Sequence, residues 1–341
     1  MGEGFPLRVA LIGLGLHSQR VLLPALQLLG VEVTAVLDPV AERREAVVRR
    51  TGATAYADLG DLLAHESFDA VVAAPSRPAH SSVIDQLIPI GRPIFIEKPA
   101  GLTAEAIVRS AELARESGTS VQVGFMRRFA PAYRLAKSIS GAWAVPLALQ
   151  LRMVAGPCAD DEVFLKDVAI HYLDLARFFL GDIRKATADV LAMGQGTPSA
   201  WQIALRAERG AATLLLSHRG TWGNPTESLW VDGPGQAVEV GNVENFRHYR
   251  AGRQGPSDDL PAKQAAGGTL SWQPNLASTG LTHQSIYLQG YLPELEAFVQ
   301  TVQFRAPVQA TLDDAGAAMR LAEQLLAEQL STEGRPPEEG F

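Results

Sequence analysis

The sequence contains almost no cysteine and no long hydrophobic run. Cys158 is the only cysteine in 341 residues, so no intramolecular disulfide can form and we expect a reducing, cytoplasmic environment. No activating motif surrounds this thiol, so we expect a structural cysteine rather than a nucleophile. No apolar stretch is long enough to cross a bilayer, and the first residues lack the basic, apolar and small-residue pattern of a signal peptide. The sequence therefore predicts neither a membrane protein nor a secreted, disulfide-bonded one.

The chain also lacks a concentration of positive charge. Thirty Lys and Arg residues stand against 37 Asp and Glu residues, for a net charge of −7 at pH 7. A nucleic-acid-binding surface needs a basic patch or stripe, and the sequence shows none. The hydrophobic fraction of 47% and the charged fraction of 20% are those of a globular protein. The length suffices for two domains of about 150 residues each, and the expected partner is a small molecule.

A glycine turn follows the first apolar segment. Arg8–Ile12 is typical of a buried strand, Gly13 and Gly15 follow it, and residues 21–29 have helical spacing. Strand, Gly-x-Gly and helix in this order bring a dinucleotide pyrophosphate against backbone amides at a helix N-terminus. Ser18 stands at the third small position, where glycine is usual, and we expect it to allow close packing of helix on strand. Taken alone, the two glycines also suit an ordinary turn.

An acidic residue follows the second predicted strand, Glu32–Leu37. Asp38 comes about twenty residues after the glycine turn, where a carboxylate can accept both ribose hydroxyls of the cofactor. The same carboxylate would repel a 2′-phosphate, so we expect NAD. Arg43 and Arg44, one helical turn further on, keep NADP as an alternative. The alternative for Asp38 itself is a turn that ends the strand.

Strand-like and helix-like segments alternate up to about residue 126, which predicts an α/β Rossmann domain with a doubly wound parallel sheet. From Pro146 the strand-like segments mostly lack helices between them, which predicts an α+β domain with a mainly antiparallel sheet. We therefore expect a dinucleotide-binding domain at 1–126, a substrate-binding and oligomerisation domain at 127–330, and a mobile tail at 331–341. The polar residues 242–285 are expected to form a long excursion, either a lid or an oligomer arm.

The predicted strand Pro93–Ile96 ends in Glu97-Lys98-Pro99. Ligands of parallel sheets bind at the carboxyl ends of the strands, so we expect this end beside the nicotinamide. Alternation along the strand sends Glu97 and Lys98 to opposite sides. A developing alkoxide requires positive charge, which selects Lys98. The alternative is a solvated lysine that protects the sheet edge.

Asp167, His171 and Asp174 have the spacing of one stripe on a predicted helix. Apolar residues occupy most other positions and only Lys166 and Arg177 mark a solvent edge, so the helix is expected to be buried. A histidine tuned by a carboxylate suits proton transfer near neutral pH. One alternative is a purely structural hydrogen-bonded network. Another is a zinc site, but no further ligand cluster is apparent and we expect no metal.

These elements together resemble the Gfo/Idh/MocA family, the relatives of glucose-fructose oxidoreductase and inositol dehydrogenase. The segments that carry the resemblance are Gly13-Leu14-Gly15, Asp38-Pro39, residues 74–80, Ile96-Glu97-Lys98-Pro99, residues 124–131 and residues 167–174. They lie in order along the chain, and the C-terminal helices also match. The sequence departs from the family pattern at Ser18 and at Ala169, where glycine is frequent. Both changes are small, and we expect altered packing rather than lost function.

The resemblance implies a catalytic triad of Lys98, Asp167 and His171. It also implies that Asp174 contacts substrate hydroxyls, that the Lys98-Pro99 peptide is cis, and that the second sheet forms a homodimer or homotetramer interface. The cofactor-binding residues are expected to be Gly13, Gly15, Leu16, His17, Asp38, Ala74, Pro75, His80, Glu97 and Lys98. The substrate-binding residues are expected to be Lys98, Arg127, Asp167, His171 and Asp174.

The function implied is reversible hydride transfer between a nicotinamide and a carbinol carbon of a sugar, inositol or related polyol. His171 would take the hydroxyl proton, Lys98 would stabilise the alkoxide, and Asp167 would hold the imidazole tautomer. One alternative is a reductase of imines or a dehydrogenase of dihydrodiols on the same scaffold. The other is a non-catalytic NAD-binding regulator, although such proteins are expected to lack the lysine or the histidine.

Overall fold

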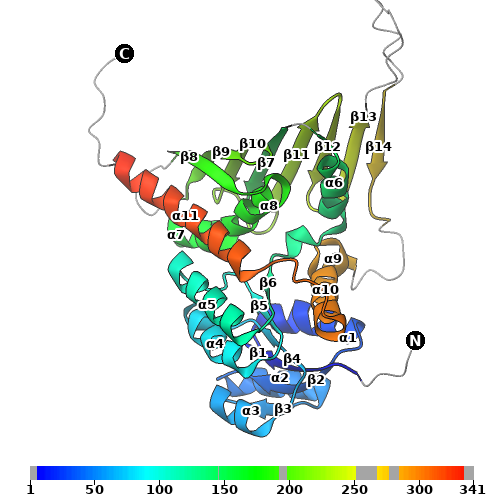
Figure 1. Cartoon of the computed structure of the whole chain (residues 1–341), viewed down its shortest axis with the longest axis vertical. Coiled ribbons are helices and arrows are strands. Elements are labelled where there is room, and N and C mark those ends of the chain that lie inside the picture. Colours follow the sequence, from blue (N-terminus) through cyan, green and yellow to red (C-terminus); the bar gives the residue numbers. More distant parts are fainter. Residues whose placement is uncertain (1–5, 145, 192–197, 251–266, 276–283, 334–341) are drawn as a thin grey trace, which may run out of the picture. The chain divides into compact units, whose positions relative to one another are not determined.

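The computed structural model describes residues 6–144, 146–191, 198–250, 267–275 and 284–333. These residues form two compact units (Figure 1). The first unit combines Met1–Phe129 with Gly280–Arg320, and the second combines Ala130–Thr279 with Leu321–Phe341.

The first unit is built on a six-stranded parallel sheet of order β3-β2-β1-β4-β5-β6. Its strands are β1 (Arg8–Ile12), β2 (Glu32–Leu37), β3 (Thr54–Tyr56), β4 (Ala70–Ala73), β5 (Ile94–Glu97) and β6 (Val121–Gly124). The four residues of β4 and of β5 are all buried, as expected of strands covered on both faces. The strand order reverses at β1 and β4, the switch point where such sheets bind their ligands. The predicted doubly wound Rossmann sheet is confirmed.

Helices connect these strands and cover the sheet. They are α1 (Leu23–Leu28), α2 (Ala41–Thr51), α3 (Leu59–His65), α4 (His80–Leu87) and α5 (Ala104–Ser117), with short helical turns η1 (Ser18–Leu22), η2 (Arg77–Ala79), η3 (Ile88–Ile90) and η4 (Met126–Arg128). The ends of α5 follow from local chemistry. Thr103 accepts the Ala106 amide at the N-terminus, and Gly118 ends the helix in the left-handed conformation.

Two helices from the far end of the chain complete the first unit. They are α9 (Gln284–Leu288) and α10 (Tyr291–Phe304), and their residues Ile286, Leu295 and Phe298 join the apolar core of β1, β2 and α1. The long helix α11 (Leu312–Glu333) begins in the first unit and ends in the second. The remaining residues of the predicted tail, 334–341, lie outside the described part of the chain.

The second unit contains an eight-stranded sheet of order β14-β13-β12-β11-β7-β10-β9-β8. Its strands are β7 (Leu147–Val154), β8 (Ile183–Leu191), β9 (Ala200–Ala207), β10 (Gly210–Ser217), β11 (Thr226–Gly233), β12 (Gln236–Gly241), β13 (Asn245–Arg250) and β14 (Gly268–Trp272). Among these neighbours β7 and β10 pair in parallel, and the other described pairs are antiparallel. The predicted mainly antiparallel sheet is confirmed.

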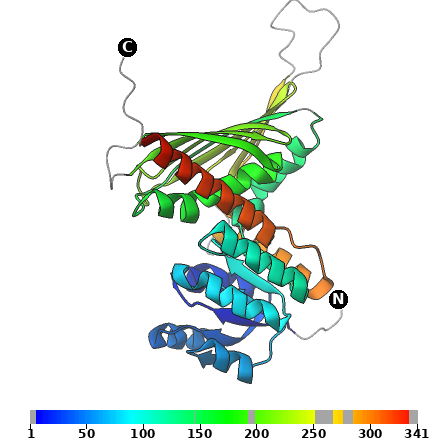
Figure 2. The same cartoon turned by 60° about the vertical axis from the view of Figure 1, so that its left-hand side comes forward.

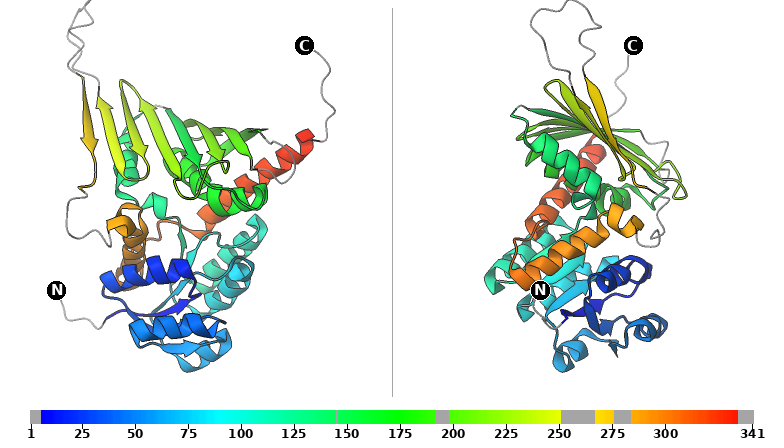
Figure 3. Two further views of the ribbon diagram at one scale, coloured as in Figure 1. Left: turned by 180° about the vertical axis from the view of Figure 1, so that it is seen from behind. Right: turned by 90° about the vertical axis from the view of Figure 1, so that its right-hand side faces the viewer.

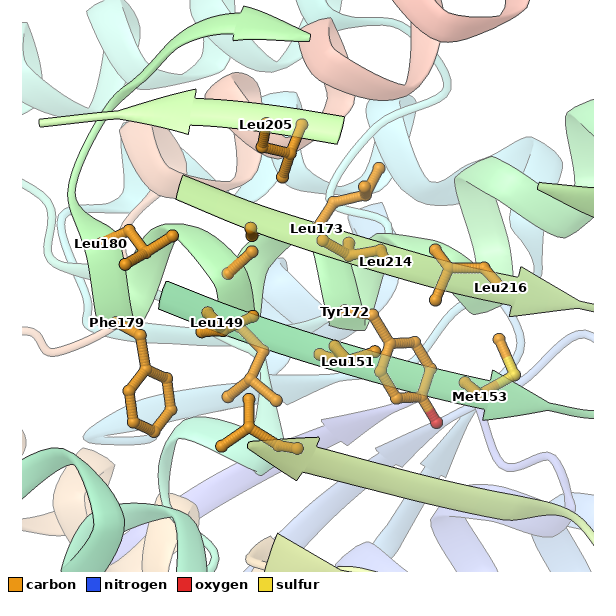
Figure 4. Close-up of a cluster of buried hydrophobic side chains, with 14 of the residues drawn as sticks. Leu149, Leu151, Met153, Tyr172, Leu173, Phe179, Leu180, Leu205, Leu214 and Leu216 are labelled. Carbon is orange, nitrogen blue, oxygen red and sulfur yellow. The ribbon is translucent and has the colours of Figure 1, made fainter. Parts of the chain in front are cut away.

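Helices cover one face of this sheet (Figure 2). They are α6 (Pro131–Gly141), which the sequence analysis missed, α7 (Asp161–Val163), η5 (Phe164–Ala169) and α8 (Ile170–Leu180). Along β7, buried and exposed residues alternate strictly, so one face packs on the helices and the other does not. Figure 4 shows the covered face, where Leu149, Leu151 and Leu214 of the strands meet Tyr172 and Leu173 of α8.

The predicted polar excursion at 242–285 is partly ordered sheet. Its described residues form β13 and β14, which pair with each other and extend the edge beyond β12 (Figure 3). Residues 251–266 and 276–283 of the excursion lie outside the described part of the chain. All five residues of β14 are exposed, so the segment lacks the alternation of buried and exposed residues by which a strand is predicted.

Candidate active site

Gly13 occupies the tight turn after β1, at the switch point of the first sheet. Its φ of +78° lies in the left-handed region, and its amide donates to the Leu37 carbonyl oxygen at 2.8 Å. A Cβ at this position would lie 2.2 Å from the carbonyl oxygen of Ala74. The turn thus fits directly against the end of β4 and accepts only glycine.

The next positions leave the loop open on one side. A Cβ on Gly15 would meet nothing within 4 Å, and Leu16 is 67% exposed. Ser18, in contrast, is buried and its hydroxyl donates to the Gly13 carbonyl oxygen at 2.5 Å. The serine therefore packs against the glycine turn, at the start of the π-helical segment η1.

Asp38 ties the end of β2 to the same loop. Its buried carboxylate accepts the Leu14 amide at 2.8 Å and the Val40 amide at 2.9 Å. Arg43 lies 3.5 Å from the same carboxylate, and Arg44 donates to the Asp38 carbonyl oxygen at 2.6 Å. The carboxylate is thus held at the carboxyl edge of the sheet, beside the glycine turn.

The residues at this edge fit a dinucleotide. The turn at Gly13 has no room for a side chain, Gly15 presents open backbone, and the held carboxylate of Asp38 lies next to both. Pro75 follows β4, and the buried His80 begins α4 a few residues later. The first unit therefore gathers Gly13, Ala74 and Asp38 within one loop cluster.

The Glu97-Lys98-Pro99 segment follows β5. The Lys98-Pro99 peptide is cis, as expected. Glu97 is buried, and one carboxylate oxygen lies 2.8 Å from Nε2 of His17 while the other accepts the Lys98 amide at 3.2 Å. Glu97 therefore links the end of β5 to the glycine loop. Arg127, on η4, lies 3.6 Å through Nη1 from the Met126 sulfur.

Asp167, His171 and Asp174 belong to the second unit. The spacing of these residues predicts a single regular helix, but residues 164–169 form a π-helix that passes into α8. The wider π turn holds one more residue than an α turn, so Asp167 precedes His171 by less than one turn. His171 and Asp174 are buried and Asp167 is half-buried. π-helical turns inside longer helices occur frequently at functional sites.

The expected solvent edge of this helix is wrong at one position. Lys166 is 8% exposed, and its ammonium lies 3.1 Å from Glu162 and 3.8 Å from Glu323 of α11. A long lysine stem can be buried when its charge is paired. Arg177 pairs with the exposed Asp182 at 2.5 Å, although its own side chain is only 12% exposed.

A buried carboxylate anchors the residue after His171. Glu227 on β11 accepts the Tyr172 hydroxyl at 2.5 Å and the Tyr133 hydroxyl at 2.6 Å. Tyr133 comes from α6, so three elements meet at one carboxylate. This contact joins α8 to β11 and to α6.

A second network, missed by the sequence analysis, precedes the π-helix. Asp161 lies 3.0 Å from Nε2 of His218 and accepts the Ser199 hydroxyl in a very short hydrogen bond. The Cys158 amide donates to Nδ1 of His218 at 3.1 Å, and the ring stacks on Phe164 at 4.5 Å. These residues lie far apart in the sequence and share no motif, so only the fold brings them together.

The environment of Cys158 opposes thiolate formation. Burial raises the pKa of this thiol, and the negative charges of Asp167, Asp160 and Asp161 raise it further. A thiol of raised pKa is a poor nucleophile at neutral pH. This agrees with a structural cysteine.

The residues that the structure describes contain neither a cluster of metal ligands nor a helix that could span a membrane. No group of three or more His, Cys, Asp or Glu side chains there could hold a metal ion. Within the same ranges, no helix combines the length and the apolar character needed to cross a membrane.

Comparisons with known proteins agree with this loop geometry. Residues 7–125 match the model of the GFO_IDH_MocA oxidoreductase family, an NAD-binding Rossmann fold. The rhizopine catabolism protein MocA of Rhizobium meliloti is 26% identical over 336 residues, 93% of each chain. An inositol 2-dehydrogenase of Burkholderia multivorans is 33% identical over 185 residues, which are 52% of this chain and 55% of that relative.

A solved structure supports the same fold. The dehydrogenase from Chromobacterium violaceum superposes with a TM-score of 0.85 at 22% identity, covering 96% of this chain and 97% of that one. Together with the Rossmann switch point, the turn at Gly13 and the carboxylate of Asp38, these matches show an NAD-binding enzyme whose residues 7–125 match the Gfo/Idh/MocA oxidoreductase family.

Proposed function

We propose that this enzyme reversibly oxidises a carbinol carbon of a sugar, an inositol or a related polyol, with NAD as cofactor. The observation that carries the proposal is the burial of His171 at the junction of η5 and α8, between Asp167 and Asp174. The name of the Burkholderia relative, an inositol 2-dehydrogenase, supports the substrate class.

The proposed cofactor residues are Gly13, Gly15, Leu16, His17, Asp38, Ala74, Pro75, His80, Glu97 and Lys98. Open backbone at Gly15 suits the approach of a pyrophosphate, and the carboxylate of Asp38 suits ribose hydroxyls. A negative charge at this position disfavours a 2′-phosphate, which supports NAD over NADP. When bound, the nicotinamide supplies the acceptor for the hydride of the substrate carbon.

Side chains of this protein would accept the proton of the substrate hydroxyl and stabilise the negative charge of the alkoxide. His171 takes the hydroxyl proton at an imidazole nitrogen, and Asp167 holds the ring in the working tautomer. Lys98 orients the hydroxyl and stabilises the alkoxide as it forms. Arg127 and Asp174 contact further substrate hydroxyls. Lys98 and Arg127 belong to the first unit, and Asp167, His171 and Asp174 belong to the second.

The proposal extends to assembly and location. We propose a homodimer or homotetramer through the face of the second sheet that carries the exposed residues of β7 and β10. We place the enzyme in the cytoplasm because its lone free Cys158 suits a reducing compartment.

The decisive test is a turnover screen with matched variants. Oxidised NAD and NADP are offered with sugars, inositols and dihydrodiols, reduced NADH and NADPH are offered with keto sugars and imines, and reduction or oxidation of the cofactor is followed by fluorescence. We expect NAD-dependent turnover of a polyol by the wild type. His171→Ala and Lys98→Ala should each lower kcat by roughly 10²–10⁴-fold, the usual contribution of acid–base catalysis, while they still bind NADH.

The control is His65→Ala, which removes an exposed histidine at the end of α3 and should leave turnover unaltered. Full activity of His171→Ala would overturn the catalytic assignment. If only imines or dihydrodiols are turned over, they are the substrates and the proposed sugar, inositol or polyol class is wrong. Tight NADH binding without turnover of any compound would indicate a regulator instead.

A further inference from the structure

Helix α10 places a carboxylic acid inside the apolar core of the first unit. Glu294 is fully buried, with Leu295 and Phe298 beside it in that core. Within the described ranges, neither of its carboxyl oxygens has a hydrogen-bond partner. A buried ionised carboxylate without partners would be strongly unfavourable. The position therefore requires an explanation.

The structure brings Glu294 to the face of the sheet on which Glu97 lies. Glu97 pairs with Gly124 across β5 and β6, and a Cβ on Gly124 would come within 2.9 Å of the Glu97 carboxylate. Gln122 precedes Gly124 by two residues and so lies on the same face. Its side-chain amide donates to the Glu294 carbonyl oxygen at 2.8 Å. Both carboxyl groups thus lie between β6 and α10.

His17 connects this pair to the glycine loop. Its Nε2 lies 2.8 Å from Glu97, and its ring meets Tyr291 edge-on with centroids 5.4 Å apart. Tyr291 and Glu294 are three residues apart on α10 and therefore share a face of the helix. Glu97 also accepts the Lys98 amide. One carboxylate thus holds the glycine loop on one side and the Lys98 backbone on the other.

Burial and a neighbouring negative charge favour the protonated form of Glu294. Burial raises the pKa of Glu294 well above its ordinary value of 4.5, and the negative charge of Glu97 raises it further. Near α10, the other charged groups of η1, η4 and the β5 end are Arg20, Arg127, Arg128 and Lys98. Arg128 pairs with Asp314 at 3.1 Å and Arg20 is exposed.

We propose that Glu294 is a positioning residue that keeps a proton beside Glu97, so that Glu97 remains the single negative charge holding His17 and the Lys98 backbone. Ionisation of Glu294 would place a second charge against Glu97 in a dry environment. Glu97 would move away, and the glycine loop would lose its contact at His17. The inference rests on the cofactor role proposed for this loop.

The test compares Glu294→Gln with Glu296→Gln. Glutamine has the shape of a protonated glutamate and cannot ionise, and Glu296 is exposed on the same helix. We measure the Kd for NADH by fluorescence at neutral and alkaline pH. We expect the ratio of alkaline to neutral Kd to reach about tenfold or more in the wild type and in Glu296→Gln. The ratio for Glu294→Gln should stay near one.

Two further measurements need neither substrate nor cofactor. The infrared carbonyl band of a protonated carboxyl group should be present at neutral pH in the wild type and absent in Glu294→Gln. The unfolded chain releases the Glu294 proton above about pH 4.5 while the folded chain retains it. Wild-type stability should therefore fall as pH rises from there towards the raised pKa, and Glu294→Gln should remove that part of the slope.

Each outcome decides the matter. A wild type without the carboxyl band, or a Glu294→Gln profile equal to that of the wild type, overturns the inference. If Glu294→Gln does not fold, the wild-type infrared spectrum still decides. If NADH binds as expected but no polyol is turned over, the proposed function fails and this inference stands.

Discussion

At the scale of single residues, Gly13 and Gly15 serve different ends although both belong to one turn. Gly13 is required by the fold, because its φ is +78° and a Cβ would strike the Ala74 carbonyl. Gly15 has open space where a Cβ would be placed, so the folded chain alone does not require it. In the proposed cofactor role, the requirement at Gly15 comes from the ligand.

This difference predicts opposite phenotypes for two alanine variants. Gly13→Ala should lose more than about 3 kcal/mol of unfolding free energy, since both the backbone conformation and the contact are disfavoured. Gly15→Ala should unfold within about 0.5 kcal/mol of the wild type but bind NADH at least about tenfold more weakly. Urea denaturation and NADH titration measure the two effects. Tight NADH binding by Gly15→Ala would contradict the assignment.

At the scale of elements, the π-to-α helix that carries His171 is held by one buried carboxylate. Glu227 of β11 accepts hydroxyls from Tyr172 of α8 and Tyr133 of α6. The side chain is buried, so both hydroxyls would lose a dry hydrogen bond if the carboxylate were removed. This contact joins α8, the helix that carries His171, to β11 and α6.

We therefore expect Glu227→Leu to cost about 2–4 kcal/mol of stability by urea denaturation. Adding Tyr133→Phe and Tyr172→Phe to this variant should restore part of the lost stability. These changes remove the two buried hydroxyls that Glu227→Leu leaves without an acceptor. A loss below about 1 kcal/mol, or no gain from the added changes, would show that the three groups do not act together.

At the scale of the whole molecule, the described helices of the second unit cover one face of its sheet, while residues of β7 and β10 on the other face are exposed. Leu215 on β10 lies on that face and is 39% exposed. If the proposed oligomer forms there, a charge at this position should disrupt it. Leu215→Glu should run as a folded monomer in light scattering while the wild type runs as a dimer or tetramer.

A matched control is Leu28→Glu, which places the same charge on α1 of the first unit at a residue that is 48% exposed. This variant should keep the wild-type mass. A monomeric wild type, or a Leu215→Glu variant of unchanged mass, would refute the sheet interface.

The sequence alone determined the features that depend on local chemistry. The turn at Gly13, the acidic end of β2 at Asp38 and the limits of α5 follow from conformational freedom, strand period and capping, which act over a few residues. These motifs resemble the Gfo/Idh/MocA family, and that resemblance implied a cis peptide at Lys98-Pro99. The match of residues 7–125 to the family and the cis peptide are both confirmed.

Only the tertiary structure decided the features that depend on distant partners. The π-helix at 164–169 changes the spacing of Asp167 and His171 from that of a regular α-helix. The hydrophobic periodicity of the sequence does not predict this π-helix. The burial of Lys166 depends on Glu323, more than a hundred residues away. Glu294 lies beside Glu97 because α10 returns to the first sheet from the far end of the chain. Such contacts follow from the packing of whole elements, which local patterns do not encode.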